Sequence, residues 1–311
     1  MAITASMVKE LREMTGVGML DCKKALTETD GDMEKAVEYL REKGLAASEK
    51  KAGRIASEGV CLAYLSDDNN TGVIVEVNSE TDFVAKNPVF REYVVQVAEQ
   101  AAGSTAADAD ALLTETWKFD TTMTVAEALS SKVAVIGENL KIRRFEKYIK
   151  EGTGLIVSYI HGGGRIGVMI EIACENPTEA VDEMGKNIAM QIAALNPKFI
   201  TTDDVPAEFI EKEKEILTQQ AMNDPKNEGK PANIVEKMIG GRLNKELKEF
   251  CLVEQPYVKD GDLTVKKYME SVAKEVGAPI SIKRMVRFET GEGLEKKVEN
   301  FAEEVAKAAK N

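Results

Sequence analysis

One pattern of residues recurs in the middle of the chain after an interval of 95 positions. In both copies apolar and polar residues alternate on either side of a short turn, as VCLAYL and GVIVEV in the first and LIVSYI and GVMIEI in the second. This alternation around a turn is typical of a β-hairpin, so the repeat predicts two related units. The matched residues are Gly59, Tyr64, Gly72, Val73, Glu76 and Glu80 in the first copy, and Gly154, Tyr159, Gly167, Val168, Glu171 and Glu175 in the second.

Each predicted hairpin is followed by a helical pattern and then by a third strand. The helical stretches are REYVVQVAEQAA and KNIAMQIAALN. The copies then end alike, on TVAEAL followed by KIRRFE and on TVKKYM followed by KRMVRFE. We therefore expect an α+β fold with two small antiparallel sheets, each with helices packed on one face, over residues 58–150 and 151–290.

The second unit is longer than the first. The first spans 88 residues from Gly59 to Glu146, and the second spans 136 from Gly154 to Glu289, which leaves 48 extra residues. The extra length falls at about 200–250, where two helical patterns flank the sequence NDPKNEGKP. Pro, Gly and Asn end a helix and turn the chain, so an inserted helical hairpin of coiled-coil character is predicted. Two interpretations of its surface stay open: plain packing, or contact with a partner or a second copy in a homodimer.

The chain outside the repeat is predicted to be helical at both ends. Residues 1–45 favour three short helices, the first capped by Thr4 and the third closed by Gly44, in a small bundle of the ubiquitin-associated kind. Residues 46–57 are polar and are expected to form a semi-rigid linker. Residues 291–311 predict an amphipathic C-terminal helix with Leu294, Val298, Phe301 and Val305 on one stripe.

Composition narrows the classes of function. A net charge of -12 argues against general binding of nucleic acid, because neutralising phosphates requires a basic surface. No apolar run approaches the roughly 18 residues of a membrane span, and charges precede any apolar segment at the start, so neither a span nor a signal peptide is expected. The four cysteines lack metal-ligand spacing, so we expect no metal, no cofactor and a reducing cytoplasm. They are Cys22, Cys61, Cys174 and Cys251.

The only histidine, His161, lies in the sequence HGGGR between two predicted strands. A phosphate-binding loop would need a Lys-Ser/Thr pair and a helix after the glycines, and neither follows. A role in turn structure or partner contact is therefore favoured over catalysis. No nucleophile or metal-binding motif occurs elsewhere, so we expect a protein that is not an enzyme.

The loop after the first hairpin differs between the two copies. The first has Thr81, Asp82 and Phe83 where the second has Asn-Pro-Thr. Phe83 is either a core residue at the end of the sheet or an exposed wedge for a partner's pocket. Its polar neighbours favour the wedge, because Thr or Asp caps a helix that starts there. The stretch TGVGMLDCKKAL likewise is either an inter-helix turn with Met19 and Leu20 packed inward or a docking face.

Two stretches around these loops, LREMTGVGMLDCKKAL and EVNSETDFVAKNPVF, resemble the signature sequences of the elongation factor Ts family. VSYIHGGGRIGVMIEI and RFETGEG also match, so the resemblance covers nearly the whole chain. The chain departs from the family at Asn87, where relatives commonly have Asp, and in the three glycines after His161. The resemblance implies a ubiquitin-associated-like N-terminal domain, two related core subdomains, an inserted helical hairpin and a C-terminal helix.

The resemblance also implies a function, the exchange of guanine nucleotide on elongation factor Tu during translation. The N-terminal domain should then grip the nucleotide-binding domain of that partner through Arg12, Gly16, Gly18, Met19 and Leu20. The loop of Thr81, Asp82, Phe83 and Val84 should enter beside the magnesium site, and His161 should contact a different domain. The alternative is an adaptor unrelated to translation that binds proteins through its head, and an enzyme is the third option.

Overall fold

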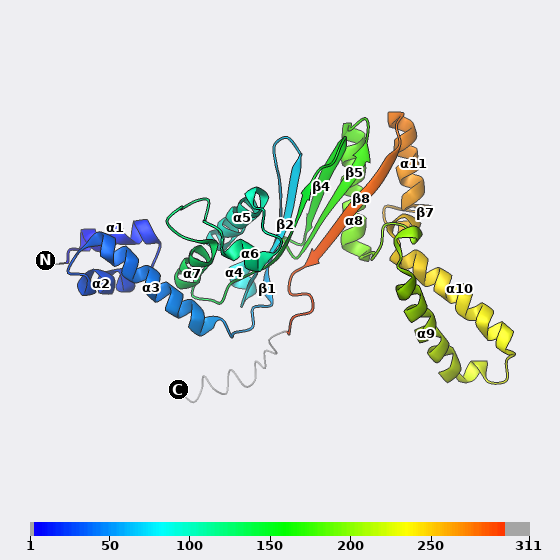
Figure 1. The fold of residues 1–311 in the computed structure, drawn as a ribbon, viewed down its shortest axis with the longest axis horizontal. Coiled ribbons are helices and arrows are strands. Elements are labelled where there is room, and N and C mark those ends of the chain that lie inside the picture. The colour runs from blue at the N-terminus through cyan, green and yellow to red at the C-terminus, as the bar shows by residue number, and fades with distance from the viewer. Residues whose placement is uncertain (1–2, 296–311) are drawn as a thin grey trace.

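The computed structural model describes residues 3–295. It is an elongated molecule in which a helical head, two sheet units and a helical hairpin follow one another along the longest axis (Figure 1). The α+β fold class expected from the sequence is confirmed. Apart from residues 291–295, the predicted C-terminal helix lies outside the described residues. Within residues 3–295 no helix is long and apolar enough to cross a membrane.

The head consists of α1 (Ala5–Thr15), α2 (Met19–Glu28) and α3 (Met33–Lys51). Thr4 caps α1 as predicted, since its side chain accepts a hydrogen bond from the backbone N–H of Met7 at 3.3 Å. A small apolar core joins the three helices. Its buried members are Val8, Leu11, Cys22, Ala25, Leu26, Ala36 and Leu40.

The third helix does not end at Gly44, as the sequence suggested, but continues to Lys51. Gly44 is buried against α7 (Val125–Ile136), and a Cβ built on it would lie 3.4 Å from the Cβ of Ala134. This glycine therefore allows two helices to approach closely rather than ending one. The first half of the predicted linker, residues 46–57, is consequently helical, and α3 docks the head on the first sheet unit.

The first unit is an antiparallel sheet in the order β1-β2-β3 with helices on one face. The helix α5 packs on β1 and β2 and buries Phe90, Tyr93 and Val97 completely. Burial of each such side chain contributes about 1.5–3 kcal/mol. The elements of this unit are β1 (Glu58–Leu65), β2 (Thr71–Ser79), α4 (Asp82–Ala85), α5 (Pro88–Gly103), α6 (Ala109–Leu113), α7 and β3 (Lys141–Ile149).

The second unit repeats this plan with a sheet in the order β4-β5-β8, on which α8 packs. A separate two-stranded sheet of β6 and β7 precedes α11. The elements are β4 (Gly154–His161), β5 (Ile166–Cys174), α8 (Glu179–Leu195), β6 (Pro256–Tyr257), β7 (Asp260–Thr264), α11 (Val265–Val276) and β8 (Ile280–Glu289).

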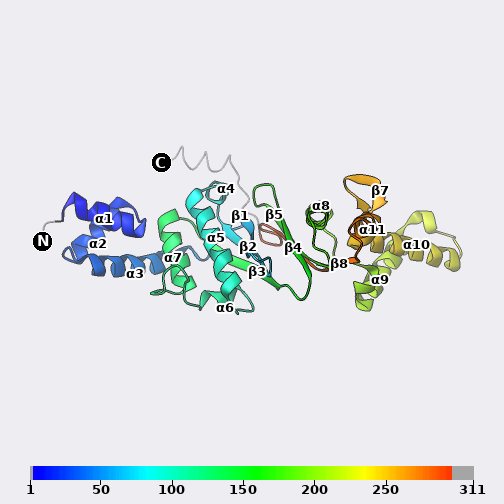
Figure 2. The same ribbon diagram turned by 90° about the horizontal axis from the view of Figure 1, so that it is seen from above.

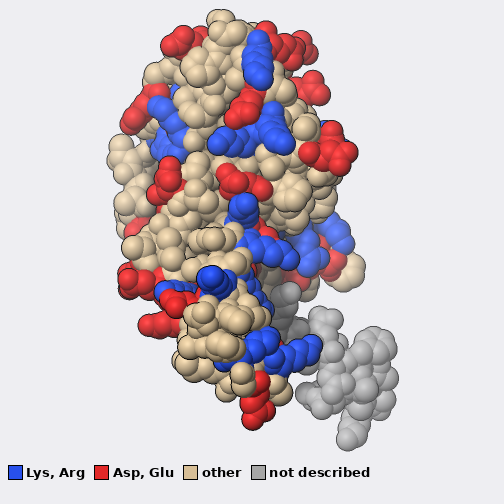
Figure 3. Space-filling view, turned by 90° about the vertical axis from the view of Figure 1, so that its right-hand side faces the viewer, with Lys and Arg blue, Asp and Glu red and all other residues tan. Residues whose placement is uncertain are grey.

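The predicted insertion is a hairpin of two helices, α9 (Ala207–Asn223) and α10 (Ala232–Phe250). It projects from the second unit at the end opposite the head (Figure 2). Its own apolar contact is narrow, with Leu217, Ile239 and Leu243 buried between the helices. On this end of the molecule Lys and Arg side chains are interspersed with Asp and Glu (Figure 3). Short 3-10 segments flank the hairpin at Thr202–Asp204 and Leu252–Glu254, and another lies in its turn at Pro225–Asn227.

The two sheets pack against each other through the faces that carry no helices. The repeated glycines make this possible: a Cβ on Gly72 would lie 2.6 Å from Ile156, and one on Gly167 would lie 2.8 Å from Ile74. Any side chain at these two positions would push the sheets apart. The buried residues of the interface are Cys61, Ile74, Tyr148, Ile156, Met169 and Phe288.

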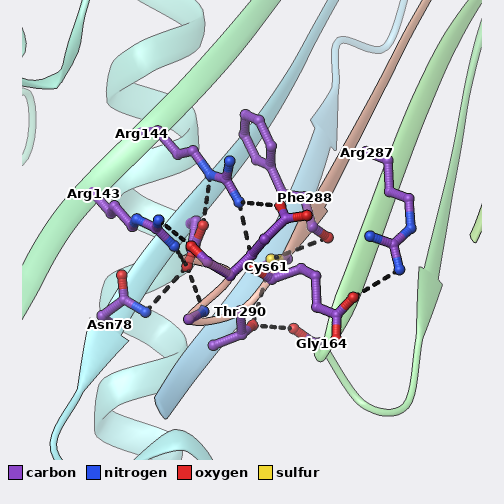
Figure 4. A network of polar contacts seen from close by, with 12 residues as sticks. Cys61, Asn78, Arg143, Arg144, Gly164, Arg287, Phe288 and Thr290 are labelled. Carbon is purple, nitrogen blue, oxygen red and sulfur yellow. Dashed lines mark hydrogen bonds and ion pairs between the residues drawn. The ribbon is translucent and has the colours of Figure 1, made fainter. Parts of the chain in front are cut away.

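A buried carboxylate, Glu76, joins the sheets through a polar network. Its partners Asn78, Arg143 and Arg144 are labelled in Figure 4. It accepts hydrogen bonds from Arg144 Nε at 2.6 Å and from Arg143 Nη1 at 2.9 Å, both within its own unit. It also accepts one from the backbone N–H of Gly291, which follows the last strand of the other unit, at 2.8 Å. The carboxylate is thus both paired and hydrogen-bonded, as a buried charge must be.

The second unit has a matching carboxylate, and the match corrects the predicted alignment of the third strands. The equivalent pairs are Glu76 with Glu171, Arg144 with Arg284, and Tyr148 with Phe288. The last two pairs are 140 positions apart, so the shared letters RFE aligned Phe145 with Phe288 wrongly, by three residues. An odd slip puts side chains on the opposite face of a sheet. The extra length of the second unit is accordingly 45 residues, not 48.

Candidate partner-binding site

The turn that carries Phe83 follows directly on β2. Thr81 caps α4, and its side-chain oxygen accepts a hydrogen bond from the backbone N–H of Val84 at 3.3 Å. Within this single helical turn the side chain of Phe83 is 81% exposed. The interpretation of Phe83 as a core residue is therefore wrong, and its ring is open to contact.

The residues on either side of Phe83 have different surroundings. Asp82 is exposed and forms an ion pair with Lys86, with 2.6 Å between Oδ2 and Nζ. Val84 is half-buried and packs against the apolar core of the first unit. Thr81 and Val84 thus hold the turn, while Asp82 and Phe83 lie on its surface.

Glu138, which follows the end of α7, anchors this turn. Its carboxylate accepts hydrogen bonds from the backbone N–H groups of Glu80 and Thr81, both at 3.0 Å, and from the hydroxyl of Thr81 at 2.6 Å. Charge-assisted bonds of this kind are about twice as strong as neutral ones. The exposed Phe83 is therefore presented on a fixed backbone.

Glu138 was not among the residues predicted from the sequence, although a comparison of the two copies of the repeat indicates it. Glu138 follows Gly137, which ends α7 in a left-handed conformation, and Ala278 follows Gly277, which ends α11 in the same way. The two copies therefore differ at this position as they do at Phe83. The comparison that singled out Phe83 applies equally to Glu138.

His161 is the last residue of β4, and its side chain is exposed. Its Nδ1 lies 3.0 Å from the hydroxyl of Tyr159, so the ring is oriented by a neighbour on its own strand. Because this exposed ring lies beside a turn, the geometry fits surface contact.

The glycines after His161 dock the turn on the first unit. The carbonyl of Gly164 accepts a hydrogen bond from the backbone N–H of Cys61 at 2.7 Å. A Cβ on Gly164 would lie 2.7 Å from Val60, and the residue has φ +107°. A side chain there is therefore disfavoured both by the contact and by the backbone conformation. We call the segment of residues 161–165 the His161 turn, and the segment of residues 81–86 the Phe83 turn.

These two turns come from different units but lie side by side. A surface cleft of about 310 Å³ is lined by both, with Asp82 and Lys86 from the Phe83 turn and Gly162, Gly163 and Arg165 from the His161 turn. The structure thus brings together two of the three predicted contact regions. They are 80 residues apart in the sequence.

The third region lies in the head, at the N-terminal end of α3, whereas α4 with the Phe83 turn lies beyond the C-terminal end of that helix (Figure 1). Gly16 ends α1 with φ +69°, its N–H bonded to the carbonyl of Arg12 at 2.8 Å, and Gly18 begins α2. The first turn of α2 then exposes Met19 and Leu20, the latter by 84%. The interpretation that packs these side chains inward is wrong. Two exposed apolar side chains beside a fixed turn form a surface suited to docking.

Some of the buried cysteine thiols have raised pKa values. Burial raises the pKa of the Cys61 thiol to about 12, and burial also raises the pKa of Cys22. Such thiols stay protonated near neutral pH and are poor nucleophiles. Within residues 3–295, no group of three or more His, Cys, Asp or Glu side chains is placed to hold a metal ion.

Comparison with known proteins bears on the same regions. A sequence model of the family described as elongation factor TS matches residues 80–292. Elongation factor Ts of Clostridium perfringens strain SM101 is 57% identical over 305 residues, which cover 98% of each chain. The proteins of that name from Clostridium novyi and Clostridioides difficile are 56% and 55% identical over 97% and 99% of each chain.

Proposed function

This chain belongs to the elongation factor Ts family, and from that premise we propose that it promotes the release of GDP from elongation factor Tu in translation. The observation that carries the proposal is the exposure of Phe83 on a turn fixed by Glu138. A rigid, exposed aromatic ring pays little entropy on binding and suits insertion into a partner's pocket.

The proposed mechanism is displacement rather than bond-breaking. Mg²⁺ joins nucleotide phosphates to a few protein oxygens and several waters in a near-octahedral shell. If Phe83 enters beside this site and separates elements of the partner, the ligands of the metal move and the nucleotide loses affinity. Asp82 stands next to Phe83 and would act on the same metal and water network. Its pairing with Lys86 keeps the carboxylate oriented.

Two further contacts would hold the partner while this occurs. We assign the head surface, with Arg12, Gly16, Gly18, Met19 and Leu20, to the nucleotide-binding domain, and His161 to a different domain. Met19 and Leu20 together present apolar area that would be removed from water on docking. The contacts are between proteins. The net charge of -12 argues against general binding of nucleic acid, and on the face shown in Figure 3 the basic side chains are interspersed with acidic ones.

The binding of nucleotide and the binding of the factor to elongation factor Tu are thermodynamically linked. Because the factor must bind nucleotide-free partner better than nucleotide-bound partner, nucleotide expels the factor by the same ratio of affinities. The protein then accelerates equilibration in both directions, and the supply of GTP over GDP sets the direction. This activity changes no covalent bond, and we place it in the cytoplasm with the ribosome.

The test is release of a fluorescent GDP analogue from elongation factor Tu of the same source, with the protein at substoichiometric amounts. We expect faster release and many turnovers per molecule. No acceleration with a competent partner would overturn the proposal and favour the adaptor alternative, in which only the head binds proteins.

A further inference from the structure

Arg91, on α5, connects the two turns that line the cleft. Its Nε donates a hydrogen bond to the carbonyl of Ala85, at the end of α4, at 3.1 Å. Its Nη2 donates to the carbonyl of Gly163, in the His161 turn. One planar guanidinium therefore spans two backbone segments from different units, with a separate nitrogen of its rigid fork donating to each, a geometry that the single nitrogen of an ammonium lacks.

The repeat shows that this bridge is particular to the first copy. The position that corresponds to Arg91 is Lys186, whose Nζ pairs with Asp182 on its own helix at 2.6 Å. Asn87 stands where the second copy has Asp182, and it uses its side chain to accept a hydrogen bond from the N–H of Val89 at 2.8 Å. Asn87 offers Arg91 no carboxylate one turn away. Among residues 3–295, no carboxylate forms an ion pair with Arg91, which leaves its donors for the two carbonyls.

Each turn already has its own anchor, so the bridge is not needed for the shape of either. Glu138 fixes the Phe83 turn, and the hydrogen bond between Cys61 and Gly164 fixes the His161 turn. The bond to Cys61 also docks the His161 turn on β1, and Arg91 adds a direct link from that turn to the end of α4, beside Phe83. Two contact points held at a fixed spacing bind one partner more tightly than two that move independently, because less freedom is lost on binding.

We propose that Arg91 is a positioning residue that sets the distance between the Phe83 turn and the His161 turn, so that both engage one molecule of elongation factor Tu together. This rests on the proposed function. Arg91 touches neither the nucleotide nor the metal in this scheme and acts through the two turns.

The experiment is a mutant cycle in the full chain, with exchange rates measured against the concentration of elongation factor Tu·GDP to give kcat and KM. Arg91→Ala should raise KM on the order of fivefold to tenfold and change kcat less than about twofold. Arg91→Lys should resemble Arg91→Ala, because it keeps the charge but has one donor nitrogen in place of the two that hold the separate carbonyls. Lys186→Ala is the matched control and should leave both constants unchanged.

Asn87→Asp supplies the sharper readout. Asp is as good a helix cap as Asn, so the fold is kept, but it places a carboxylate four residues before Arg91, in the favourable orientation for pairing. This variant should raise KM by drawing Arg91 away from Gly163, and should add no further increase in KM when Arg91 is already Ala.

A KM within twofold of wild type for Arg91→Ala would overturn the proposal, as would a joint loss of stability and kcat at unchanged KM. Failure of the proposed function is a separate result, since the wild-type protein itself would then not accelerate release, and the positioning role would fall with it.

Discussion

At the scale of single residues, substitution of the exposed Phe83 and of its half-buried anchor Glu138 should affect stability differently. Phe83→Ala removes a ring that touches little of its own protein, so the free energy of unfolding should change by less than about 0.5 kcal/mol. Exchange activity should fall by about tenfold or more, since burying such a ring in a partner is worth about 1.5–3 kcal/mol. Urea unfolding and release of the fluorescent GDP analogue measure the two effects.

Val89→Ala is the control for this variant, because Val89 is another exposed apolar residue near the same turn. It should leave exchange near the wild-type rate. Strong unfolding by Phe83→Ala with normal exchange would contradict the wedge.

Substitution of Glu138, unlike that of Phe83, should lower both the free energy of unfolding and the exchange activity. Glu138→Ala leaves the N–H groups of Glu80 and Thr81 without their acceptor, at a cost of about 1–3 kcal/mol. Exchange should fall although Phe83 is intact, because the turn is no longer fixed. Glu138→Gln should also weaken the turn, since an amide NH₂ faces donors, whereas Glu92→Ala on the exposed side of α5 should change neither property. Normal exchange in Glu138→Ala would show that the turn needs no anchor.

At the scale of elements, the head is joined to the body by α3, which continues past Gly44 onto α7. Deletion of residues 1–54 should weaken binding of elongation factor Tu by about tenfold or more, because the apolar surface at Met19 and Leu20 is lost with it. The body should keep its sheets, since their core has no residue from the head. Circular dichroism and titration of the partner check both statements, and unchanged affinity in a folded truncation would remove the docking role.

The inserted hairpin exposes Ile216, Met222, Ile234 and Met238 around its narrow core. We predict that replacing residues 212–248 by a tight turn changes self-association and largely spares exchange, because the hairpin projects away from α4 and the head (Figure 1). Sedimentation over a range of protein concentrations measures the first effect. A folded variant that has lost exchange would instead place the hairpin in the partner contact.

Helices and strands were predictable where residues within a few positions determine them, and less so where packing against a distant part of the chain does. The hairpins, the cap at Thr4 and the insertion follow from alternation, capping and turn residues within a few positions. Gly44 misled because a glycine that permits close packing looks the same in sequence as one that ends a helix. The slip of three residues between the third strands arose because RFE recurs by letters, while the true register is fixed by Glu76 and Glu171.

The candidate site was predictable as separate pieces only. Phe83 and His161 were each found from the sequence, one by contrast between copies and one as the sole histidine. Their nearness, and the bridge of Arg91 to Gly163 across 72 positions, depend on two sheets packing face to face. Single-sequence patterns carry no information on that distance.

At the scale of the whole molecule, the interface between sheets joins the halves into one body. Gly72→Val should destabilise the protein by about 1–3 kcal/mol, because its side chain would collide with Ile156 and Met169. The buried thiol of Cys61 reports the same event, since it should react with a thiol reagent faster once the sheets separate. Gly103→Ala, at a position where nothing lies within 4 Å, is the control and should do neither. Wild-type stability in Gly72→Val would mean that the interface is loose.

The stacking of arginines on aromatic rings across the interface has a consequence for how the chain folds during synthesis. Arg144 of the first unit stacks on Phe288 of the second at 4.3 Å, and Arg284 stacks on Tyr148 of the first at 4.2 Å. The first sheet is complete in sequence at Ile149, but Phe288 is added only 139 residues later. Ile156 and Met169 of β4 and β5 follow soon after Ile149, but the part of the inner face that packs on Phe288 stays uncovered on the ribosome until β8 is synthesised. Neither half reaches its final packing before the other, so the nascent chain matures as one piece, close to the end of its own translation.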